Sequence, residues 1–334
     1  MNRRRILTWS PSLTVPLTHD CPWRCHYCGY RSDGQGLISE AELERLLVRA
    51  VEKQATEVLF LSGEIPGTLP HIREELTRRG HRDFVEFAHH ACRRALDLGL
   101  LPHCNLGAMS VVQFARLAEV NASMGLMLEN LDDAFNQTVA PEKSAAGRLR
   151  AIAAAGEARV PFTSGILIGL GESRESRIRS LDALAELQAR YGHLQEIILQ
   201  NFIPNTGSLL RQSPQSLSLE DYLELITHWR QVAPEVALQI PPNLNPFWKE
   251  LISHIDDLGG ISADGDLVNP DTPWEAPLVY ARACAELGFE LRHRWPVYDT
   301  FVERGWVSPQ VREVLIQRGR ERQQLESQAR RADL

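Results

Sequence analysis

Short apolar runs alternate with amphipathic stretches along most of this chain. The runs predict β-strands because they are mainly apolar and are bounded by glycine or by polar residues. Pro16 within the first run predicts an irregular or edge position there, because proline cannot donate a ladder hydrogen bond. The predicted strands cover residues 13–18, 57–63, 100–107, 122–130, 160–171, 195–202, 236–245 and 258–262.

The stretches between the runs predict helices. Ser39 and Glu42 form an S-x-x-E capping box, and Leu43, Leu47 and Ala50 then follow on one helical face. A second capping box at Ser218 opens another helix, and a charged tail at 317–334 predicts a solvated helix. Further helices are predicted at 83–98, 110–119, 143–156, 174–190 and 275–287.

Strands that alternate with helices indicate βαβ units and therefore a parallel sheet. Eight such units in roughly 250 residues fit a (β/α)₈-type, TIM-like barrel. A partial barrel of six strands or a doubly wound sheet would give a similar pattern. We expect residues 1–12 to be an N-terminal extension, 13–290 the barrel domain and 291–334 a C-terminal extension with its charged tail.

The composition of the 334 residues narrows the class of protein. The chain is 43% apolar and 24% charged, which is typical of a globular protein. A net charge of −7 argues against nucleic acid or an anionic membrane as the main partner. No signal peptide and no run of ~18 apolar residues is visible, so we expect a cytoplasmic protein.

Three of the six cysteines fall within 21-CPWRCHYC-28. Such clustering in a reducing compartment indicates metal or redox chemistry rather than disulfides. Zinc would need a fourth ligand, which would have to be His19, His26 or a distant cysteine. A 4Fe–4S cluster normally takes four cysteines, so three would leave one iron with an open position for chemistry.

The spacing C-x₃-C-x₂-C, with Tyr27 before the last cysteine, resembles the signature of the radical S-adenosylmethionine superfamily. The resemblance implies that Cys21, Cys25 and Cys28 each bind one iron of a 4Fe–4S cluster. S-adenosylmethionine would chelate the fourth iron, and its reductive cleavage would give a 5′-deoxyadenosyl radical. The loop follows the first predicted strand, which places the cluster at the C-terminal mouth of the barrel.

Three later stretches also resemble the superfamily pattern, and with Tyr27 they supply the implied cofactor-binding residues. Ser62, Gly63 and Glu64 stand where a Gly-Gly-Glu-like turn meets the methionine amino group, with serine in place of the first glycine. The stretch 165-GILIGLGE-172 resembles the G-x-I-x-G-x-x-E motif that packs against adenine; Gly165, Gly169 and Glu172 match it. Glu129 ends the fourth strand, where a carboxylate contacts ribose or the amino-acid part, unless it is simply a solvated strand-end acid.

Polar side chains gather at the ends of other predicted strands. His103 and Asn105 share one face of the third strand. Gln200 and Asn201 end the sixth strand, and Asn243 and Asn245 end the seventh. Such a ring suits a polyhydroxylated, nitrogen-rich substrate, although each residue could equally cap a strand or helix.

Longer stretches resemble one family, subunit 1 of 7,8-didemethyl-8-hydroxy-5-deazariboflavin synthase. The residues 29-GYR-31 and 62-SGEIPG-67 depart from the family pattern without touching the cluster ligands. The stretches that carry the resemblance are 98-LGLLPHCNLGAMS-110, 122-ASMGLMLEN-130, 161-PFTSGILIGLGES-173, 191-YGHLQEIILQNF-202, and 256-DDLGGIS-262 with 269-NPDTPWE-275.

This resemblance implies a carbon–nitrogen lyase. The radical would abstract a hydrogen from 5-amino-5-(4-hydroxybenzyl)-6-(D-ribitylimino)-5,6-dihydrouracil, and ring closure with loss of ammonia would give the deazaflavin. Subunit 2 of the synthase would supply that substrate. Cys92, Cys104 and Cys284 are isolated and predict no second cluster, so an external ferredoxin or flavodoxin is implied as reductant. The sequence identifies no acid or base that handles protons.

Three alternatives stay open. The first is the sister subunit's reaction, which joins the tyrosine side chain to 5-amino-6-ribitylaminouracil. The second is another radical enzyme with a similar barrel, such as a relative of biotin synthase. The third is a zinc- or cluster-binding interaction protein without catalysis.

Overall fold

A closed ring of eight parallel strands forms the centre of the molecule. The computed structural model describes residues 5–262 and 264–332. The strands follow the order β2-β3-β4-β5-β6-β7-β8-β1-β9, and a further pairing of β1 with β2 closes the ring. The strands are β1 (Arg5–Thr18), β2 (Glu57–Ser62), β3 (Leu101–Asn105), β4 (Ser123–Gly125), β5 (Phe162–Ile168), β6 (Leu194–Asn201), β7 (Ala237–Gln239), β8 (Asp257–Ser262) and β9 (Phe289–His293).

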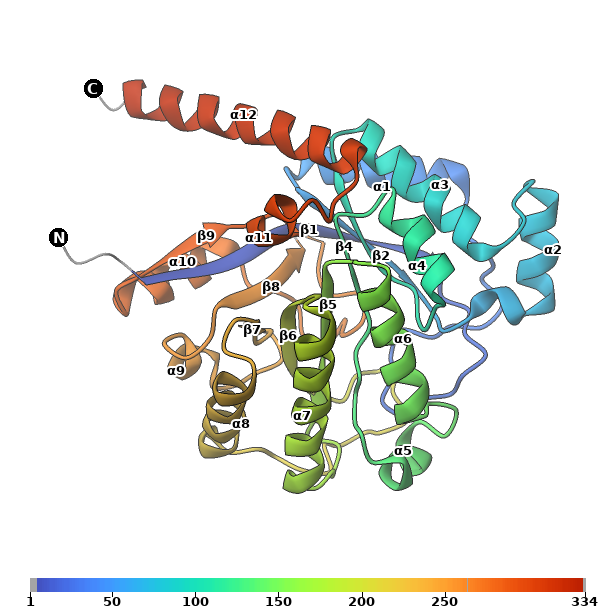
Figure 1. Ribbon diagram of the computed structural model, residues 1–334, viewed down its shortest axis with the longest axis vertical. Coiled ribbons are helices and arrows are strands. Elements are labelled where there is room, and N and C mark those ends of the chain that lie inside the picture. The colour runs from blue at the N-terminus through green and yellow to red at the C-terminus, as the bar shows by residue number, and fades with distance from the viewer. Residues whose placement is uncertain (1–4, 263, 333–334) are drawn as a thin grey trace.

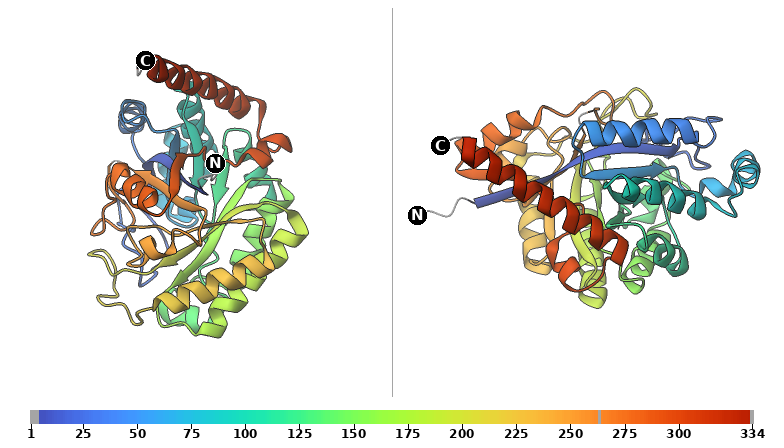
Figure 2. Two further views of the ribbon diagram at one scale, coloured as in Figure 1. Left: turned by 90° about the vertical axis from the view of Figure 1, so that its left-hand side faces the viewer. Right: turned by 90° about the horizontal axis from the view of Figure 1, so that it is seen from above.

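Helices surround this ring on the outside (Figure 1). The final helix lies across one end of the barrel and projects past its body, while the short fifth helix lies at the opposite end (Figures 1 and 2). No helix in the described ranges is long and apolar enough to span a membrane. The helices are α1 (Glu40–Glu52), α2 (Pro70–Arg78), α3 (Phe84–Asp97), α4 (Val111–Ala118), α5 (Asp133–Val139), α6 (Ala145–Glu157), α7 (Arg174–Tyr191), α8 (Leu219–Val232), α9 (Trp248–Leu251), α10 (Pro277–Glu286), α11 (Asp299–Glu303) and α12 (Pro309–Ala332), with a 3₁₀ turn at Pro66–Thr68.

All eight predicted strands are present, and the prediction of a full barrel is confirmed. β1 is longer than predicted, because its first residues, Arg5–Trp9, pair with β9, a strand that the sequence did not predict. β4 and β7 are shorter than predicted, with three residues each. Pro16 marks an irregularity, since the β1–β2 register shifts between Pro16 and Thr18.

Both predicted N-caps form, but they differ in completeness. Ser218 makes the full capping box, with reciprocal bonds to residue Asp221. Ser39 accepts a bond from the Glu42 amide, yet the Glu42 carboxylate turns to Arg45 instead of reaching back. The reciprocal half of the first capping box was therefore wrong, because an exposed arginine one turn away offers the carboxylate a charged partner.

The outward faces of the strands carry the apolar core. Phe60, Phe162 and Leu199 are fully buried against the helices. The inward faces are more polar, and several inward side chains in the half of the barrel nearer the C-terminal strand ends, such as Leu59, Asn105 and Ile198, remain partly exposed. Side-chain packing therefore leaves space in that half of the barrel, the lumen.

A buried ion network closes the other half, the floor. The segment after β9 carries Arg294, whose guanidinium pairs with Asp257 at 2.6 Å and with Glu196 at 3.1 Å. The Tyr298 hydroxyl donates to Glu196 at 2.7 Å. Because this segment crosses the N-terminal ends of the strands, any ligand of the lumen must enter from the C-terminal mouth.

Candidate active site at the mouth of the barrel

The cysteine loop follows β1 directly and lies at the C-terminal mouth, as predicted. Cys21, Cys25 and Cys28 are half-buried free thiols. The remaining cysteines are buried elsewhere: Cys92 and Cys104 lie between α3 and β3, and Cys284 lies in α10.

Backbone contacts from two distant segments hold the loop. The His26 amide donates to the Val139 carbonyl at 2.7 Å, at the end of α5. The His26 carbonyl accepts from Ser208 Oγ at 2.9 Å and from the Leu209 amide at 2.8 Å, both in the connection between β6 and α8. The loop thus takes its shape from residues more than a hundred positions away in the sequence.

Gly63 packs directly against the first cysteine. A Cβ atom at residue 63 would lie 2.4 Å from Cys21 Cβ and 2.6 Å from the Asp20 carbonyl oxygen. Only glycine fits there without displacing the loop, since real Cβ contacts are longer. The neighbouring Ser62 hydroxyl donates to the Gly63 carbonyl at 2.8 Å. The 62–64 turn therefore lies beside the thiols, although the methionine-binding role remains a prediction.

Four charged side chains form a buried cluster beside the loop, the mouth cluster: Glu64, Glu129, Lys143 and Arg148. Lys143 Nζ lies 2.7 Å from Glu129 Oε1, and Arg148 pairs with Glu64. Arg148 also lies 3.7 Å from Glu129, so the two pairs are joined. The negative charges of the two carboxylates and the positive charges of Lys143 and Arg148 neutralise one another in this low-dielectric region.

Tyr27 joins the mouth cluster to the cysteine loop. Lys143 Nζ donates to the Tyr27 hydroxyl at 3.0 Å and lies 5.3 Å from the centre of its ring. Burial raises the pKa of Tyr27 well above its ordinary value, with the Glu129 charge adding to the effect, so the phenol stays protonated. Burial opposes the charge of Lys143, but Glu129 raises its pKa well above the ordinary value and keeps it a cation.

Glu129 itself stands in an unusual backbone conformation. Its φ of +70° is in the left-handed region that favours glycine, at a typical cost of about 1–3 kcal/mol. A bridge to Ile166 of β5 fixes this conformation, and the Glu129 carbonyl accepts from the Leu167 amide at 3.0 Å. The surrounding strands thus hold the Glu129 carboxylate in the mouth cluster.

The glycine-rich motif of β5 shapes the rim next to the loop. A Cβ at Gly165 would lie 2.2 Å from the Ile198 carbonyl oxygen, and Gly169 has a φ of +90°. The Glu172 carboxylate accepts from the Gly169 amide at 2.9 Å and pairs with Arg177, so it holds the turn rather than facing a ligand. A small apolar cluster of Leu167, Leu170 and Phe202 lies beside this turn and contacts Tyr27.

The predicted substrate residues divide into two groups. His103, Asn105 and Gln200 face the lumen and are partly exposed. Within the described ranges, the Asn105 and Gln200 side chains make no hydrogen bond to protein, which leaves them free for a ligand. Asn201, Asn243 and Asn245 instead line a separate cavity of about 480 Å³ between the loops after β6 and β7.

The two asparagines predicted to end the seventh strand lie in the loop beyond it, since β7 stops at Gln239. Asn243 Nδ2 donates to Asp266 at 3.0 Å, and Asn245 Oδ1 accepts from the Phe247 amide at 2.8 Å. Asn201 Nδ2 donates to the Leu244 carbonyl at 3.0 Å. These three amides therefore hold loops together, and their role toward a substrate stays a prediction.

Lys143 and Arg148 were not predicted from the sequence. Arg148 had a signal, because it lies on the buried face of an alanine-rich helix, in line with Ala145, Ala151 and Ile152. A single arginine on such a face indicates a buried ion pair. Lys143 precedes the helix in an irregular segment, and no pattern distinguishes it from an exposed lysine.

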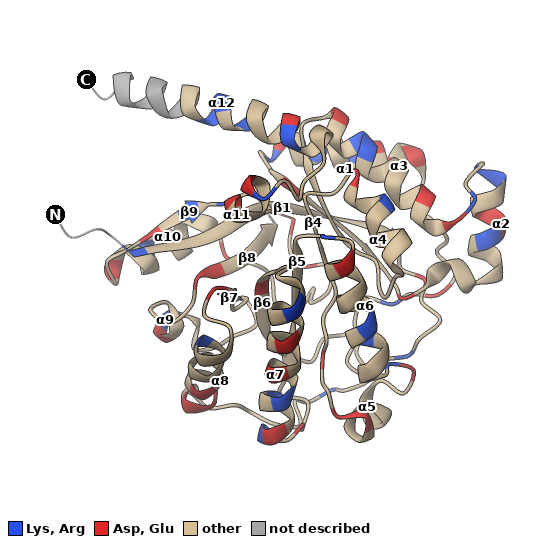
Figure 3. Cartoon of the chain, in the orientation of Figure 1, with Lys and Arg blue, Asp and Glu red and all other residues tan. Residues whose placement is uncertain are grey.

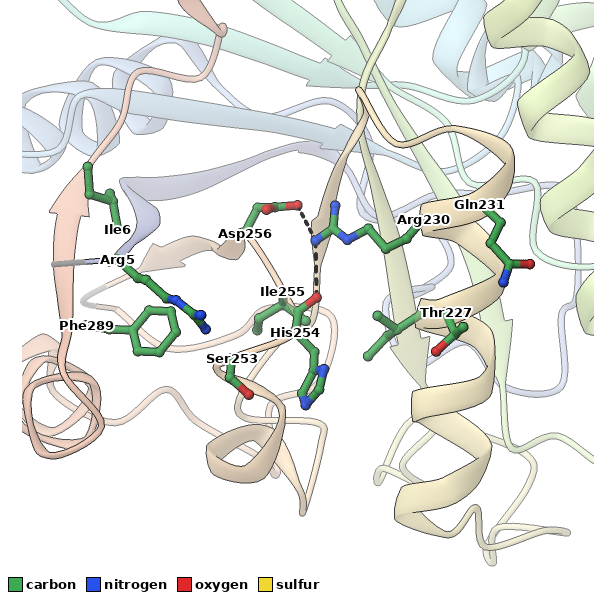
Figure 4. A pocket seen from close by; sticks show the side chains of 11 residues that line it. Arg5, Ile6, Thr227, Arg230, Gln231, Ser253, His254, Ile255, Asp256 and Phe289 are labelled. Carbon is green, nitrogen blue, oxygen red and sulfur yellow. Dashed lines mark hydrogen bonds and ion pairs between the residues drawn. The ribbon is translucent and has the colours of Figure 1, made fainter. Parts of the chain in front are cut away.

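A further cavity is far from this chemistry. It has a volume of about 620 Å³ and lies among the ends of β1, β9 and α8 at the floor side of the barrel (Figure 4). Arg230 at its wall pairs with Asp256 at 2.7 Å. Its lining includes Arg5 and Phe289, which begin β1 and β9, whereas the cysteines follow the end of β1, so the cavity is at the opposite end of the barrel from the thiols.

The three thiols supply the donors that three irons of an iron–sulfur cluster would need. Among the residues that the structure describes, no three His, Cys, Asp or Glu side chains converge to hold one metal ion. Each thiolate of a cluster binds a different iron, so such convergence is not needed. Burial raises the pKa of Cys25 to about 11, and coordination to iron would instead keep the thiolate deprotonated.

Comparison with known proteins agrees with this arrangement. The model of the Radical SAM superfamily matches residues 15–184. A 7,8-didemethyl-8-hydroxy-5-deazariboflavin synthase of Methanothermobacter thermautotrophicus is 39% identical over 316 residues, covering 92% of this chain and 96% of that protein. The synthase of Archaeoglobus fulgidus is 39% identical over 307 residues, covering 90% and 93%.

Solved structures share the fold at low identity. HydG, a maturase of the [FeFe]-hydrogenase, superposes with a TM-score of 0.68 at 19% identity, over 86% of this chain and 65% of that one. Methylornithine synthase superposes with a TM-score of 0.64 at 19% identity, over 86% and 84%. With its thiol loop at the mouth of a (β/α)₈ barrel and its full-length likeness to these synthases, the chain belongs to the 7,8-didemethyl-8-hydroxy-5-deazariboflavin synthase family of radical SAM enzymes.

Proposed function

We propose that this enzyme catalyses the ammonia-releasing step of deazaflavin formation. Its substrate is 5-amino-5-(4-hydroxybenzyl)-6-(D-ribitylimino)-5,6-dihydrouracil, and its product is 7,8-didemethyl-8-hydroxy-5-deazariboflavin. The reaction class is that of a carbon–nitrogen lyase. The observation that carries the proposal is the 39% identity over 92% of the chain to synthases named for this product.

Cys21, Cys25 and Cys28 would hold a 4Fe–4S cluster, with S-adenosylmethionine on the fourth iron. When bound, this pair supplies the radical that removes a hydrogen atom from the substrate. The mouth cluster supports the amino-acid end of the cofactor, because Lys143 and Arg148 suit a carboxylate, and Glu64 and Glu129 suit an ammonium group. Gly63 keeps the turn close enough for such contacts.

The lumen would hold the substrate. His103, Asn105 and Gln200 offer hydrogen bonds to its uracil, phenol and ribityl groups, and the closed floor shields the radical from bulk water. Asn201, Asn243 and Asn245 would act at the rim.

The proposal includes partners outside the chain. Subunit 2 of the synthase would deliver the tyrosine-derived substrate, and a ferredoxin or flavodoxin would supply the electron. We also propose that the enzyme works in the cytoplasm, where such reductants are available. In the view of Figure 3, basic and acidic residues are interspersed over the described helices, and we propose no nucleic-acid or membrane partner.

Anaerobic reconstitution tests the proposal. We expect about four irons and four sulfides per chain, and 5′-deoxyadenosine when a reductant and S-adenosylmethionine are added. With purified subunit 2 present, the deazaflavin chromophore should appear only when both proteins are combined. Cys25→Ala should abolish both products, whereas Cys284→Ala, which changes a buried cysteine of α10, should retain them.

Three outcomes would contradict parts of the proposal. Deazaflavin from subunit 2 alone would refute the assigned reaction. Coupling of tyrosine to 5-amino-6-ribitylaminouracil by this chain alone would assign the sister reaction instead. One bound zinc with no 5′-deoxyadenosine would refute catalysis by a radical.

A further inference from the structure

A hydrogen-bonded chain links the lumen to the floor. His103 Nδ1 of β3 lies 2.7 Å from Ser123 Oγ of β4. Ser123 Oγ in turn lies 2.5 Å from the Pro296 carbonyl oxygen, in the segment that crosses the floor. These two bonds therefore connect three separate parts of the sequence through Ser123.

The directions of these bonds follow from simple counting. A carbonyl oxygen can only accept, so Ser123 must donate its single hydroxyl hydrogen to Pro296. The Pro296 carbonyl also accepts from Gln195 Nε2 at 3.0 Å, which occupies both of its lone pairs. Ser123 Oγ has no second hydrogen to offer, so His103 must donate from Nδ1.

His103 is therefore held in one tautomer, with hydrogen on Nδ1 and a lone pair on Nε2. Burial and the nearby Arg294 charge lower the pKa of His103 to about 3, so the ring is neutral at physiological pH. A neutral ring with a fixed tautomer offers one feature to the lumen, a hydrogen-bond acceptor.

The Nε2 atom of His103 lies beside Gly125 of β4. A Cβ atom at residue 125 would lie 2.9 Å from Nε2, and the residue there is glycine. Any larger side chain would cover the acceptor. His103 as a residue is partly exposed, and it lies on the same face of β3 as Asn105.

We propose that His103 Nε2 accepts a hydrogen bond from an N–H or O–H group on the ring system of the substrate, and so selects and positions that ring system in the lumen. This inference rests on the proposed function for the identity of the ligand. The uracil imide and the phenol are the two groups with this chemistry. His103 is thus a specificity-determining residue, and Ser123 and Pro296 are positioning residues that fix its tautomer.

The tautomer can be measured without a substrate. In holoenzyme labelled with ¹⁵N-histidine, long-range proton–nitrogen correlation should show a protonated Nδ1 and an unprotonated Nε2 for His103. The signals are assigned by their loss in His103→Gln. Ser123→Ala should yield a mixture of tautomers, whereas Ser164→Ala should not, although Ser164 is an equally buried serine that also donates to a backbone carbonyl. An Nε2–H tautomer or an imidazolium in the wild type would overturn the inference.

Binding of the deazaflavin product tests the ligand. His103→Phe should weaken binding by roughly 10–100-fold, because a ligand donor is left without a partner. His103→Gln should stay within about threefold, because its amide oxygen can accept the same bond. Product analogues methylated at the imide nitrogen or at the phenol oxygen distinguish the donors, since only the true donor's methylation should remove the difference between wild type and His103→Phe.

The possible failures are distinguishable. If the wild type binds deazaflavin and His103→Phe binds it equally well, the inference alone is overturned. If the wild type binds no deazaflavin and forms none with subunit 2, the proposed function is contradicted and the inference falls with it.

Discussion

At the scale of single residues, the mouth cluster shows how buried charged side chains stabilise one another despite the free-energy cost of removing them from water. Glu64 and Arg148 are both nine-tenths or more buried, and each would be costly without the other. Burial alone would raise the pKa of Glu64, but Arg148, Lys143 and the Ala108 amide together hold it below its ordinary value. The carboxylate therefore contributes stability above the pKa of the unfolded chain, near pH 4.3, and loses it as the pH falls through the lower folded value.

This pairing predicts the effect of Arg148→Met. The variant leaves the buried Glu64 charge uncompensated, so the free energy of unfolding at pH 7 should fall by about 3–5 kcal/mol. The loss should shrink as the pH falls below about 4.3, because protonation then begins to remove the Glu64 charge that the variant leaves without a partner. Urea unfolding at pH 7 and pH 4 checks both statements.

Arg150→Met is the matched control, because Arg150 lies on the same helix with an exposed side chain. It should change the free energy of unfolding by no more than about 0.5 kcal/mol. Equal losses in the two variants would show that the Glu64–Arg148 pair adds nothing to stability.

Functional residues could be predicted from the sequence where they belong to a motif of fixed spacing or where the backbone conformation requires glycine. The three cysteines, Gly63, Gly165 and Gly169 follow motifs whose spacing can be read directly, and the structure gives each glycine a steric or conformational reason. Lys143 was not predictable, because its neighbours Glu129 and Tyr27 are brought to it only by the closed barrel. Such contacts between distant segments leave no periodic trace in the sequence.

At the scale of elements, the contact between β5 and β6 explains why a glycine lies within a buried strand. The Ile198 carbonyl occupies the place where a Gly165 side chain would be. We predict that Gly165→Ala separates the two strands and destabilises the protein by more than about 3 kcal/mol, in line with a severe core clash. Loss of soluble protein or a lowered unfolding midpoint would be the measured result.

Gly319→Ala makes the same chemical change in α12, where a new Cβ meets nothing within 4 Å. It should stabilise the helix by about 0.5–1 kcal/mol, because glycine is a poor helix residue. If Gly165→Ala proved equally harmless, the close approach of β6 would be refuted.

The floor segment predicts a pH dependence. Burial raises the pKa of Glu196 to about 8, with Asp257 adding to the effect and Arg294 opposing it. The folded state thus binds a proton that the unfolded chain has lost above about pH 4.5, so stability should fall as the pH rises from 5 to 8. Glu196→Gln, which resembles the protonated acid, should flatten this slope in urea unfolding at three pH values.

Glu186→Gln on the exposed face of α7 serves as the control and should leave the slope unchanged. A slope that persisted undiminished in Glu196→Gln would assign the proton to another group.

The eight strands of the barrel could be predicted from the sequence, because each is an apolar run. β9 and the floor segment could not, because their charged residues conceal their place in the barrel.

At the scale of the whole molecule, the C-terminal region has two parts of different importance. Residues Arg294–Tyr298 neutralise and close the floor, while α12 buries Val311, Val314 and Leu315 near its start and then projects outward (Figure 2). The sequence predicted one extension from residue 291 onward, because charge alone does not separate a plug from a projecting helix.

Two truncations test this division. A chain that ends after Gln317 retains the buried contacts of α12, and its unfolding midpoint should drop by no more than about 4 °C. A chain that ends after His293 lacks Arg294 and leaves Asp257 and Glu196 as unpaired buried acids, so it should fail to accumulate as folded protein. Thermal unfolding of the purified chains decides, and a folded, stable product of the shorter truncation would contradict the role of the floor.

The length of β1 has a consequence for the order of assembly. This strand precedes the other strands of the ring in the sequence, yet it pairs with β8 and β9, which are made about 240 to 290 residues later. The anchors of the cysteine loop, Val139 and Ser208, are also made late. During synthesis the three thiols are therefore tethered to an unfinished ring. The loop that carries Cys21, Cys25 and Cys28 can take its final shape only when the later segments that anchor it are in place, so the geometry of the mouth depends on the closure of the barrel.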